Sequence, residues 1–218
     1  MIWPTIVIDN FFNNPKAVIE FANNLEFQKN DGRYPGYRTK QLGEIENNFF
    51  QISTSKIMAA LYPNESYMGS LQWTANQYFQ KIKTNENLEP GYVHQDLDAE
   101  FTAIVYLSDE EDAGTAIFKK IKEPVPHHEE DKKKGYLKSK KSKDYFNSIK
   151  RNRECFQQTL EFTSVKNRMV LFDSSHFHAV NNFGKKQKER LTLITFFSSI
   201  AKVDGTPLKF HANECGKL

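Results

Sequence analysis

The chain has 218 residues, a net charge of +3 and two cysteines, Cys155 and Cys215. Hydrophobic residues make up 39% of the chain and aromatic residues 13%, which excludes disorder throughout and favours one domain with a sizeable core. No apolar run approaches the ~18 residues of a membrane-spanning helix, and the first residues lack a signal-peptide pattern. Two cysteines this far apart do not form a disulfide framework. We therefore expect a soluble, cytoplasmic protein without a membrane partner.

The predicted elements begin with a strand at Ile2–Asp9, which alternates and is rich in β-branched residues. Asn14 and Pro15 have the pattern of a helix cap and a first helical residue, and apolar residues follow at helical spacing. A second helix is expected over Thr54–Tyr62, where a proline follows. Strands are predicted from there on, at Leu71–Ile82, Phe101–Leu107, Thr115–Lys119, Thr159–Val165, Met169–Phe172 and Arg190–Ser199. Helices followed by many strands favour a mainly β, α+β fold, with the helices packed against a β-sandwich or barrel.

A Lys-rich insertion at about 119–153 interrupts the strands of this single domain, 1–218. It holds thirteen basic and five acidic residues, a net charge of +8 against +3 for the whole chain. Most such stretches are solvated loops, but this one could attract phosphate, an acidic partner or a nucleic acid. Its last part, Tyr145–Phe156, has a helical pattern with Phe146, Ile149 and Phe156 on one face. We therefore expect at least part of the insertion to pack against the domain.

Two separated groups of side chains suit a metal site. His94 and Asp96 lie two residues apart, so an extended backbone points both to one side. His176 and His178 follow a predicted strand, and strand parity allows either of them to join the first pair. Two histidines and one carboxylate form the facial triad of non-heme iron sites, which leaves three coordination positions open.

A third feature is Arg190, which opens a very apolar strand. An arginine at a strand end usually reaches to solvent, but in a pocket its planar guanidinium suits bidentate binding of a carboxylate. The alternative cations lie in a predicted loop: Lys185, Lys186 and Lys188. The remaining histidines lie in charged or terminal segments and are expected on the surface: His127, His128 and His211.

In order and spacing these groups resemble the 2-oxoglutarate/Fe(II)-dependent dioxygenases, most nearly their prolyl-4-hydroxylase-like branch. In that family a His-x-Asp pair is followed by a distal histidine and then by an arginine or lysine, which correspond to His94, Asp96, His178 and Arg190. His178 is preferred to His176 because its flanking residues, an aromatic one before and a hydrophobic one after, match the family. The resemblance covers roughly residues 71–199 without the insertion. It implies a double-stranded β-helix of the jelly-roll or cupin type with flanking N-terminal helices.

The resemblance also implies an oxidoreductase, a hydroxylase that uses Fe(II), 2-oxoglutarate and O2 and releases succinate and CO2. The implied metal ligands are His94, Asp96 and His178. The implied residues for the cosubstrate are Tyr78, Tyr106, Arg190 and Thr192. An aspartate among the ligands favours oxidation over halogenation, while demethylation and desaturation stay open beside hydroxylation. The substrate, a small molecule or a peptide, is not specified by these residues.

Two other classes of function fit the same sequence. One is a cupin-like barrel that binds a metal or a small acid without oxidising anything. The other is a nucleic-acid-associated module in which residues 119–153 bind and the barrel serves as a scaffold. For an oxygenase, loops select the substrate, so the insertion is a candidate lid or platform. Further candidates for the mouth of the site are Thr39, Lys40, Asn47 and Asn48.

Overall fold

The computed structural model describes residues 3–29, 32–62, 71–83, 90–108, 113–124, 143–183 and 189–201. Its helices are α1 (Pro15–Asn23), α2 (Leu42–Ile45), α3 (Asn47–Leu61) and α6 (Lys143–Arg153). Its strands are β1 (Ile6–Ile8), β2 (Gln28–Lys29), β3 (Tyr37–Arg38), β4 (Gln72–Lys83), β5 (Phe101–Tyr106), β6 (Thr115–Lys120), β7 (Phe156–Phe162), β8 (Met169–Asp173), β9 (Phe177–Val180) and β10 (Glu189–Ala201). Among the described helices, none combines the length and apolar character that crossing a bilayer would need.

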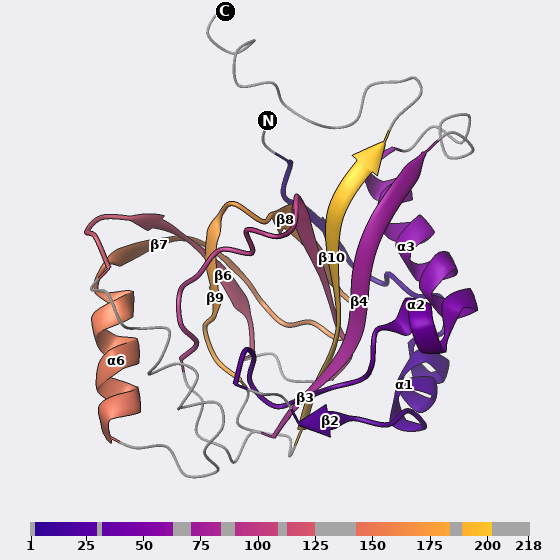
Figure 1. Cartoon of the computed structure of the whole chain (residues 1–218), viewed down its shortest axis with the longest axis horizontal. Helices are drawn as coiled ribbons and strands as arrows, with labels where there is room; N and C mark the ends of the chain where they lie inside the picture. The colour runs from indigo at the N-terminus through magenta and orange to yellow at the C-terminus, as the bar shows by residue number, and fades with distance from the viewer. Residues whose placement is uncertain are drawn as a thin grey trace, which may run out of the picture.

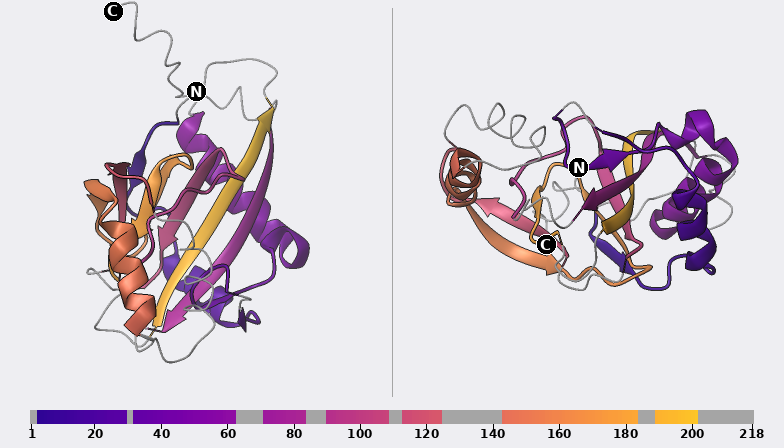
Figure 2. Two further views of the ribbon diagram at one scale, coloured as in Figure 1. Left: turned by 60° about the vertical axis from the view of Figure 1, so that its left-hand side comes forward. Right: turned by 90° about the horizontal axis from the view of Figure 1, so that it is seen from below.

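Two antiparallel sheets form the body of the molecule. The described strands give a major sheet in the order β1-β8-β5-β10-β4-β3-β2 and a minor sheet in the order β7-β6-β9. Helices α1 to α3 cover one face of the major sheet, while the minor sheet faces its other side and α6 lies beyond the minor sheet (Figures 1 and 2). This arrangement confirms the predicted mainly β, α+β class with flanking N-terminal helices.

The central strands of the major sheet are buried on both sides. Every residue of β5 and β8 is buried, because the helices cover one face and the minor sheet the other. Along β10, Leu193 and Phe197 belong to the large cluster under the helices, whereas Ile194 joins Tyr106 and Ile117 in the cluster between the sheets. Successive side chains of β10 point to opposite faces of the sheet. One set therefore packs under the helices, and the other lies between the two sheets, where the candidate site is.

Several boundaries differ from those predicted. Helix α3 begins at Asn47 rather than at Thr54, because Phe49 packs on aromatic rings of α1 and β4 and extends the helix. The helix of the insertion ends at Arg153, and Phe156 instead opens β7, which starts earlier than predicted. Phe146 was wrongly assigned to the packed face of that helix, since it is 38% exposed.

The turn before β8 is fixed by Asn167. Its φ is 64°, a left-handed conformation that asparagine adopts more readily than most residues. Its side-chain Oδ1 accepts a hydrogen bond from Phe12 N at 2.8 Å, and its Nδ2 donates to Phe12 O at 2.8 Å. The N-terminal segment is therefore tied to the turn that leads into the central strand β8.

We predict that Asn167→Ala lowers the free energy of unfolding by about 2–4 kcal/mol, because two buried hydrogen bonds are lost and alanine disfavours a positive φ. Asn167→Gly accepts the same φ and should recover about 1 kcal/mol of that loss. Denaturant unfolding of the three proteins measures both effects. Equal stability of wild type and Asn167→Ala would contradict this account of the turn.

Candidate metal centre

His94, Asp96 and His178 converge on one point. One ligand atom from each residue lies within 4.8 Å of the corresponding atom of the other two. The convergence follows from an antiparallel bridge in which His94 N donates to His178 O at 3.0 Å and His178 N donates to His94 O at 2.8 Å. The segment before Asp96 thereby pairs with the edge strand β9 of the minor sheet. His176, the alternative to His178, is not part of this group among the described residues.

Both imidazole rings are oriented by backbone carbonyls. His94 Nδ1 lies 2.9 Å from Tyr92 O, and His178 Nδ1 lies 2.9 Å from His176 O. A carbonyl only accepts, so each Nδ1 donates and each neutral ring carries its lone pair on Nε2. Metal-ligating histidines are commonly fixed in this way.

The distances between the ligand atoms fit a single cation. His178 Nε2 lies 3.3 Å from Asp96 Oδ2, and His94 Nε2 lies 3.7 Å from Asp96 Oδ1. Neighbouring ligand atoms on an octahedral first-row metal are about 3 Å apart, given bonds of about 2.1 Å. Lone pairs that face one another at this range repel unless a positive charge lies between them. The donor set therefore suits a divalent metal ion.

The Asp96 carboxylate is held by two hydroxyl groups in series. Thr102 Oγ1 donates to Asp96 Oδ2 at 2.9 Å and lies 2.8 Å from Ser174 Oγ. Because the Thr102 proton goes to the carboxylate, Ser174 must donate to Thr102. Burial raises the pKa of Asp96, but hydrogen bonds with His178 and Thr102 and the attraction of both histidines hold that pKa well below its usual range. Asp96 is therefore ionised at neutral pH, and its carboxylate attracts a cation.

A cleft of about 640 Å³ contains the three residues and also reaches Arg190. Arg190 is 2% exposed, and its Nε has no hydrogen-bond partner among the described residues. In the part of the chain that the structure describes, no carboxylate forms an ion pair with it. Burial lowers the pKa of Arg190, but a guanidinium remains charged in proteins. A buried cation without a counter-charge suits an anionic ligand.

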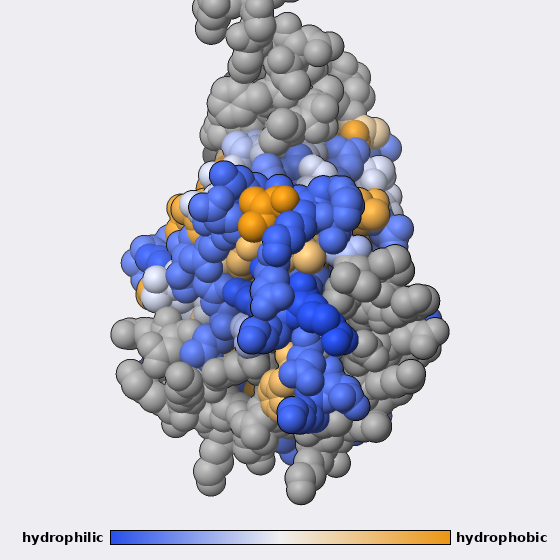
Figure 3. Space-filling model, turned by 90° about the vertical axis from the view of Figure 1, so that its left-hand side faces the viewer, coloured by the Kyte–Doolittle hydropathy of each residue, from blue (hydrophilic) through white to orange (hydrophobic). Residues whose placement is uncertain are grey.

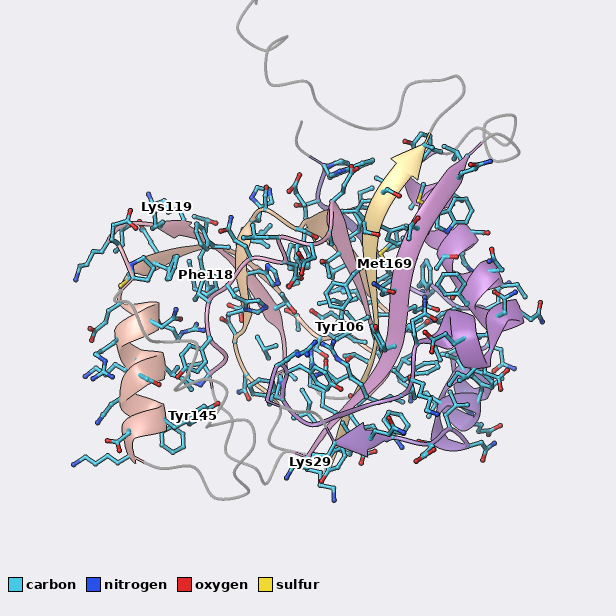
Figure 4. The ribbon with its side chains drawn as sticks, in the orientation of Figure 1. Lys29, Tyr106, Phe118, Lys119, Tyr145 and Met169 are labelled. Atoms are coloured by element: carbon cyan, nitrogen blue, oxygen red, sulfur yellow. The ribbon has the colours of Figure 1, made fainter. Side chains whose placement is uncertain are left out.

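The other residues predicted for the cosubstrate lie near Arg190 in different ways. Tyr78 lines the cleft, while Tyr106 and Thr192 are fully buried behind its wall. Tyr106 Oη donates to Thr115 Oγ1 at 2.8 Å, and Figure 4 shows Tyr106 between the two sheets. Burial raises the pKa of Tyr106, so its hydroxyl stays protonated. Thr192 pairs in register with Tyr106, and within the described ranges its buried Oγ1 has no hydrogen-bond partner.

One wall of the cleft was not predicted. It comes from strand β3 and the turn before it. The guanidinium of Arg38 in β3 lies 3.9 Å from the ring centroid of Tyr34 in the turn and 5.5 Å from that of Tyr78. The residues expected at the mouth were wrong. Thr39 is buried and accepts a hydrogen bond from the β4 backbone, and Asn47 opens a helix on the opposite face of the sheet. Neither Lys40 nor Asn48 lines the cleft. The sequence signal for this wall was the Pro-Gly pair before β3. Such a pair predicts a turn, but it does not predict which side of the sheet the turn covers.

Most of the insertion lies outside the described residues. So do six residues that were considered from the sequence as alternative ligands, carboxylate partners or surface residues: His127, His128, Lys185, Lys186, Lys188 and His211.

The fold is similar to that of solved 2-oxoglutarate/Fe(II) oxygenases. HygX from Streptomyces hygroscopicus, solved with nickel and 2-oxoglutarate bound, has a TM-score of 0.55 at 13% identity, covering 89% of this chain and 82% of HygX. SnoN, a non-heme alpha ketoglutarate dependent epimerase from nogalamycin biosynthesis, has a TM-score of 0.53 at 11% identity, covering 94% of this chain and 81% of SnoN. A Burkholderia pseudomallei oxidoreductase of the 2OG-Fe(II) oxygenase family has a TM-score of 0.50 at 11% identity, covering 89% and 84%. The predicted double-stranded β-helix is thus confirmed as the fold.

No curated protein matches the chain by sequence. A family model does match, over residues 3–197, and that range contains every residue of the candidate metal centre as well as Arg190. The model is that of DUF6445, a family of unknown function, and the chain belongs to this family.

Proposed function

We propose that the protein is an Fe(II)- and 2-oxoglutarate-dependent oxygenase that hydroxylates its substrate and releases succinate and CO2. The observation that carries the proposal is the meeting of two imidazoles and one carboxylate in the same cleft as a buried arginine that has no carboxylate partner among the described residues. The similarity in fold to HygX, which was solved with nickel and 2-oxoglutarate bound, supports the same conclusion.

His94, Asp96 and His178 would hold the metal. Two neutral imidazoles and one carboxylate on one face leave the opposite face open for further ligands. When bound, Fe(II) supplies the redox chemistry by which O2 and 2-oxoglutarate oxidise a C–H bond, which no side chain of the cleft provides. The part of the protein is to fix the three ligands, and the hydroxyl pair of Thr102 and Ser174 does this for Asp96.

Arg190 would bind the far carboxylate of 2-oxoglutarate. Its planar guanidinium matches a carboxylate bidentately, and the cleft leads from the partly exposed ligands to this buried group. Thr115 lines the cleft and receives the Tyr106 proton, so its own hydroxyl proton is available to the same carboxylate. Tyr106 would then orient Thr115 rather than touch the ligand. Thr192 offers a second hydroxyl beside Arg190, and Tyr78 forms part of the cleft wall.

Metal and cosubstrate binding are tested by anaerobic addition of Fe(II) and 2-oxoglutarate. We expect a visible metal-to-ligand charge-transfer band, because a 2-oxo acid chelates ferrous iron. Asp96→Ala removes a ligand and should abolish the band, whereas Asp98→Ala, which changes an exposed carboxylate of the same cleft, should retain it. In air, wild type should form succinate and Asp96→Ala should not.

Absence of the band in folded wild-type protein would overturn the proposal. A band without succinate formation, even with candidate substrates present, would instead indicate a barrel that binds metal and acid without oxidation.

The role of Arg190 is tested with two 2-oxo acids that differ in the far carboxylate. Wild type should bind 2-oxoglutarate at least about 30-fold more tightly than 2-oxovalerate, because an unpaired buried charge costs about 2–5 kcal/mol. Arg190→Met should bind both acids about equally while its affinity for the metal alone stays unchanged. Titration of the Ni(II)-loaded proteins measures these affinities. A variant that still prefers 2-oxoglutarate would place the carboxylate elsewhere.

A further inference from the structure

Helix α6, the described end of the Lys-rich insertion, has two different faces. Its outer face carries the exposed Lys143, Lys150 and Arg151, and this side of the molecule is largely hydrophilic (Figure 3). Its inner face buries Ser148 and Asn152 together with apolar residues. Buried polar side chains on a helix need partners, and those partners identify what the helix binds.

The partner of Asn152 is the backbone of the segment that carries two metal ligands. We call residues 91–96 the ligand segment. On its inner edge, His94 pairs with β9, and Gly91 N donates to Val180 O at 2.8 Å. On its outer edge, Asn152 Oδ1 accepts from Val93 N at 2.8 Å and Asn152 Nδ2 donates to Val93 O at 3.2 Å. The Asn152 side chain thus forms the two hydrogen bonds with the Val93 backbone that a neighbouring β-strand would otherwise form.

The neighbouring Arg153 adds a second connection. Its guanidinium donates to Gly91 O at 3.0 Å and to Asn181 Oδ1 at 3.1 Å. Asn181 directly follows β9, the strand of His178. Arg153 therefore fastens the start of the ligand segment to the end of the strand with which that segment pairs.

Helix α6 also contacts the side chain of Tyr92, the residue whose carbonyl orients His94. The Tyr92 hydroxyl forms a hydrogen bond with Ser148, and the Tyr92 ring packs on Tyr145 with centroids 6.0 Å apart. Tyr145 lies on α6 in Figure 4. Tyr92 O is the acceptor for His94 Nδ1. Helix α6 thus anchors the side chain of the residue whose carbonyl orients the His94 ring.

We propose that α6 is a positioning element of the metal centre, and that Asn152 and Arg153 are positioning residues that hold the ligand segment against β9. This inference rests on the proposed function, because it takes His94 and Asp96 to be metal ligands. Asn152 is 5% exposed and Val93 4% exposed, so removal of the amide leaves two backbone groups without partners in a buried place. The ligand segment would then loosen beside His94, and metal affinity would fall.

The test uses Mn(II) alone and the full-length protein. Mn(II) binding is measured by the loss of the free-ion signal in electron paramagnetic resonance. Asn152→Ala should raise the dissociation constant for Mn(II) at least tenfold, as loss of outer-shell support does at other metal sites. The matched control is Asn147→Ala, at an exposed position of the same helix, which should change it less than twofold.

A spectroscopic measurement separates positioning from general destabilisation. The visible spectrum of the Co(II)-loaded protein reports coordination geometry, and it should change in Asn152→Ala but not in Asn147→Ala. Thermal unfolding of the metal-free proteins establishes that each variant is folded at the temperature of the titration. If Asn152→Ala does not fold, Arg153→Met provides the same test, with a rise of at least tenfold expected.

Each outcome decides between the proposals. Folded variants that bind Mn(II) as tightly as wild type, with unchanged Co(II) spectra, overturn the role of α6 and leave the proposed function intact. Wild-type protein that binds no Mn(II) overturns both. Weaker binding and an altered spectrum in Asn152→Ala, with neither change in Asn147→Ala, support the role of α6.

Discussion

The site depends on the reciprocal pair of backbone hydrogen bonds between His94 and His178. These residues are far apart in the chain, and nothing local brings their side chains together. Once their backbones pair in antiparallel register, the two rings lie with centroids 4.5 Å apart, and Asp96 follows two residues later on the same side. Asp96 N then donates to Ser174 O, which extends the contact between the two segments. The antiparallel bridge between this one pair of residues thus brings the three candidate metal ligands together.

Two opposite charges lie at different places in the cleft. The carboxylate of Asp96 belongs to the ligand segment and accepts a hydrogen bond from Thr102 on β5, while the guanidinium of Arg190 lies on β10. Arg190 is buried and Asp96 is largely buried. A metal cation would neutralise the carboxylate of Asp96, and an organic anion would neutralise the guanidinium of Arg190. An acid that chelates a metal at one end and carries a carboxylate at the other satisfies both.

The sequence predicts well those features that have a regular spacing. Long apolar strands such as β5 and β10 follow from their residue types, and Asn14 caps α1 as expected, accepting a hydrogen bond from Ala17 N at 3.2 Å. The two-residue spacing of His94 and Asp96 predicts a common direction, and the structure places both beside His178. His176 and His178 lie on the same side of an extended strand, so strand alternation alone could not show which one is the ligand. Only the bridge with His94 distinguishes them.

Features that depend on tertiary contacts were missed. Strand β3 has two residues, too few for a periodic pattern, yet it brings Arg38 to the cleft wall. In α6, apolar periodicity points to Phe146 as a packed residue, but the structure buries Asn152 instead. From the sequence alone, an asparagine that binds the backbone of a distant segment cannot be distinguished from one exposed to solvent. Only the position of Val93 reveals its partner.

The unequal support of the two sheets has a consequence for the order in which the molecule opens. The major sheet rests on the large cluster under α1 to α3. The minor sheet packs through the smaller cluster around Tyr106 and Ile117, and it shares a further small cluster around Val93 and Phe118 with the ligand segment. Free energies of partial opening follow the buried apolar contacts of each region. The half that carries His178 and the ligand segment should therefore open and reclose many times for each complete unfolding event, while the half that carries Arg190 stays closed. Such a division would let a metal ion bound at this group exchange without loss of the fold.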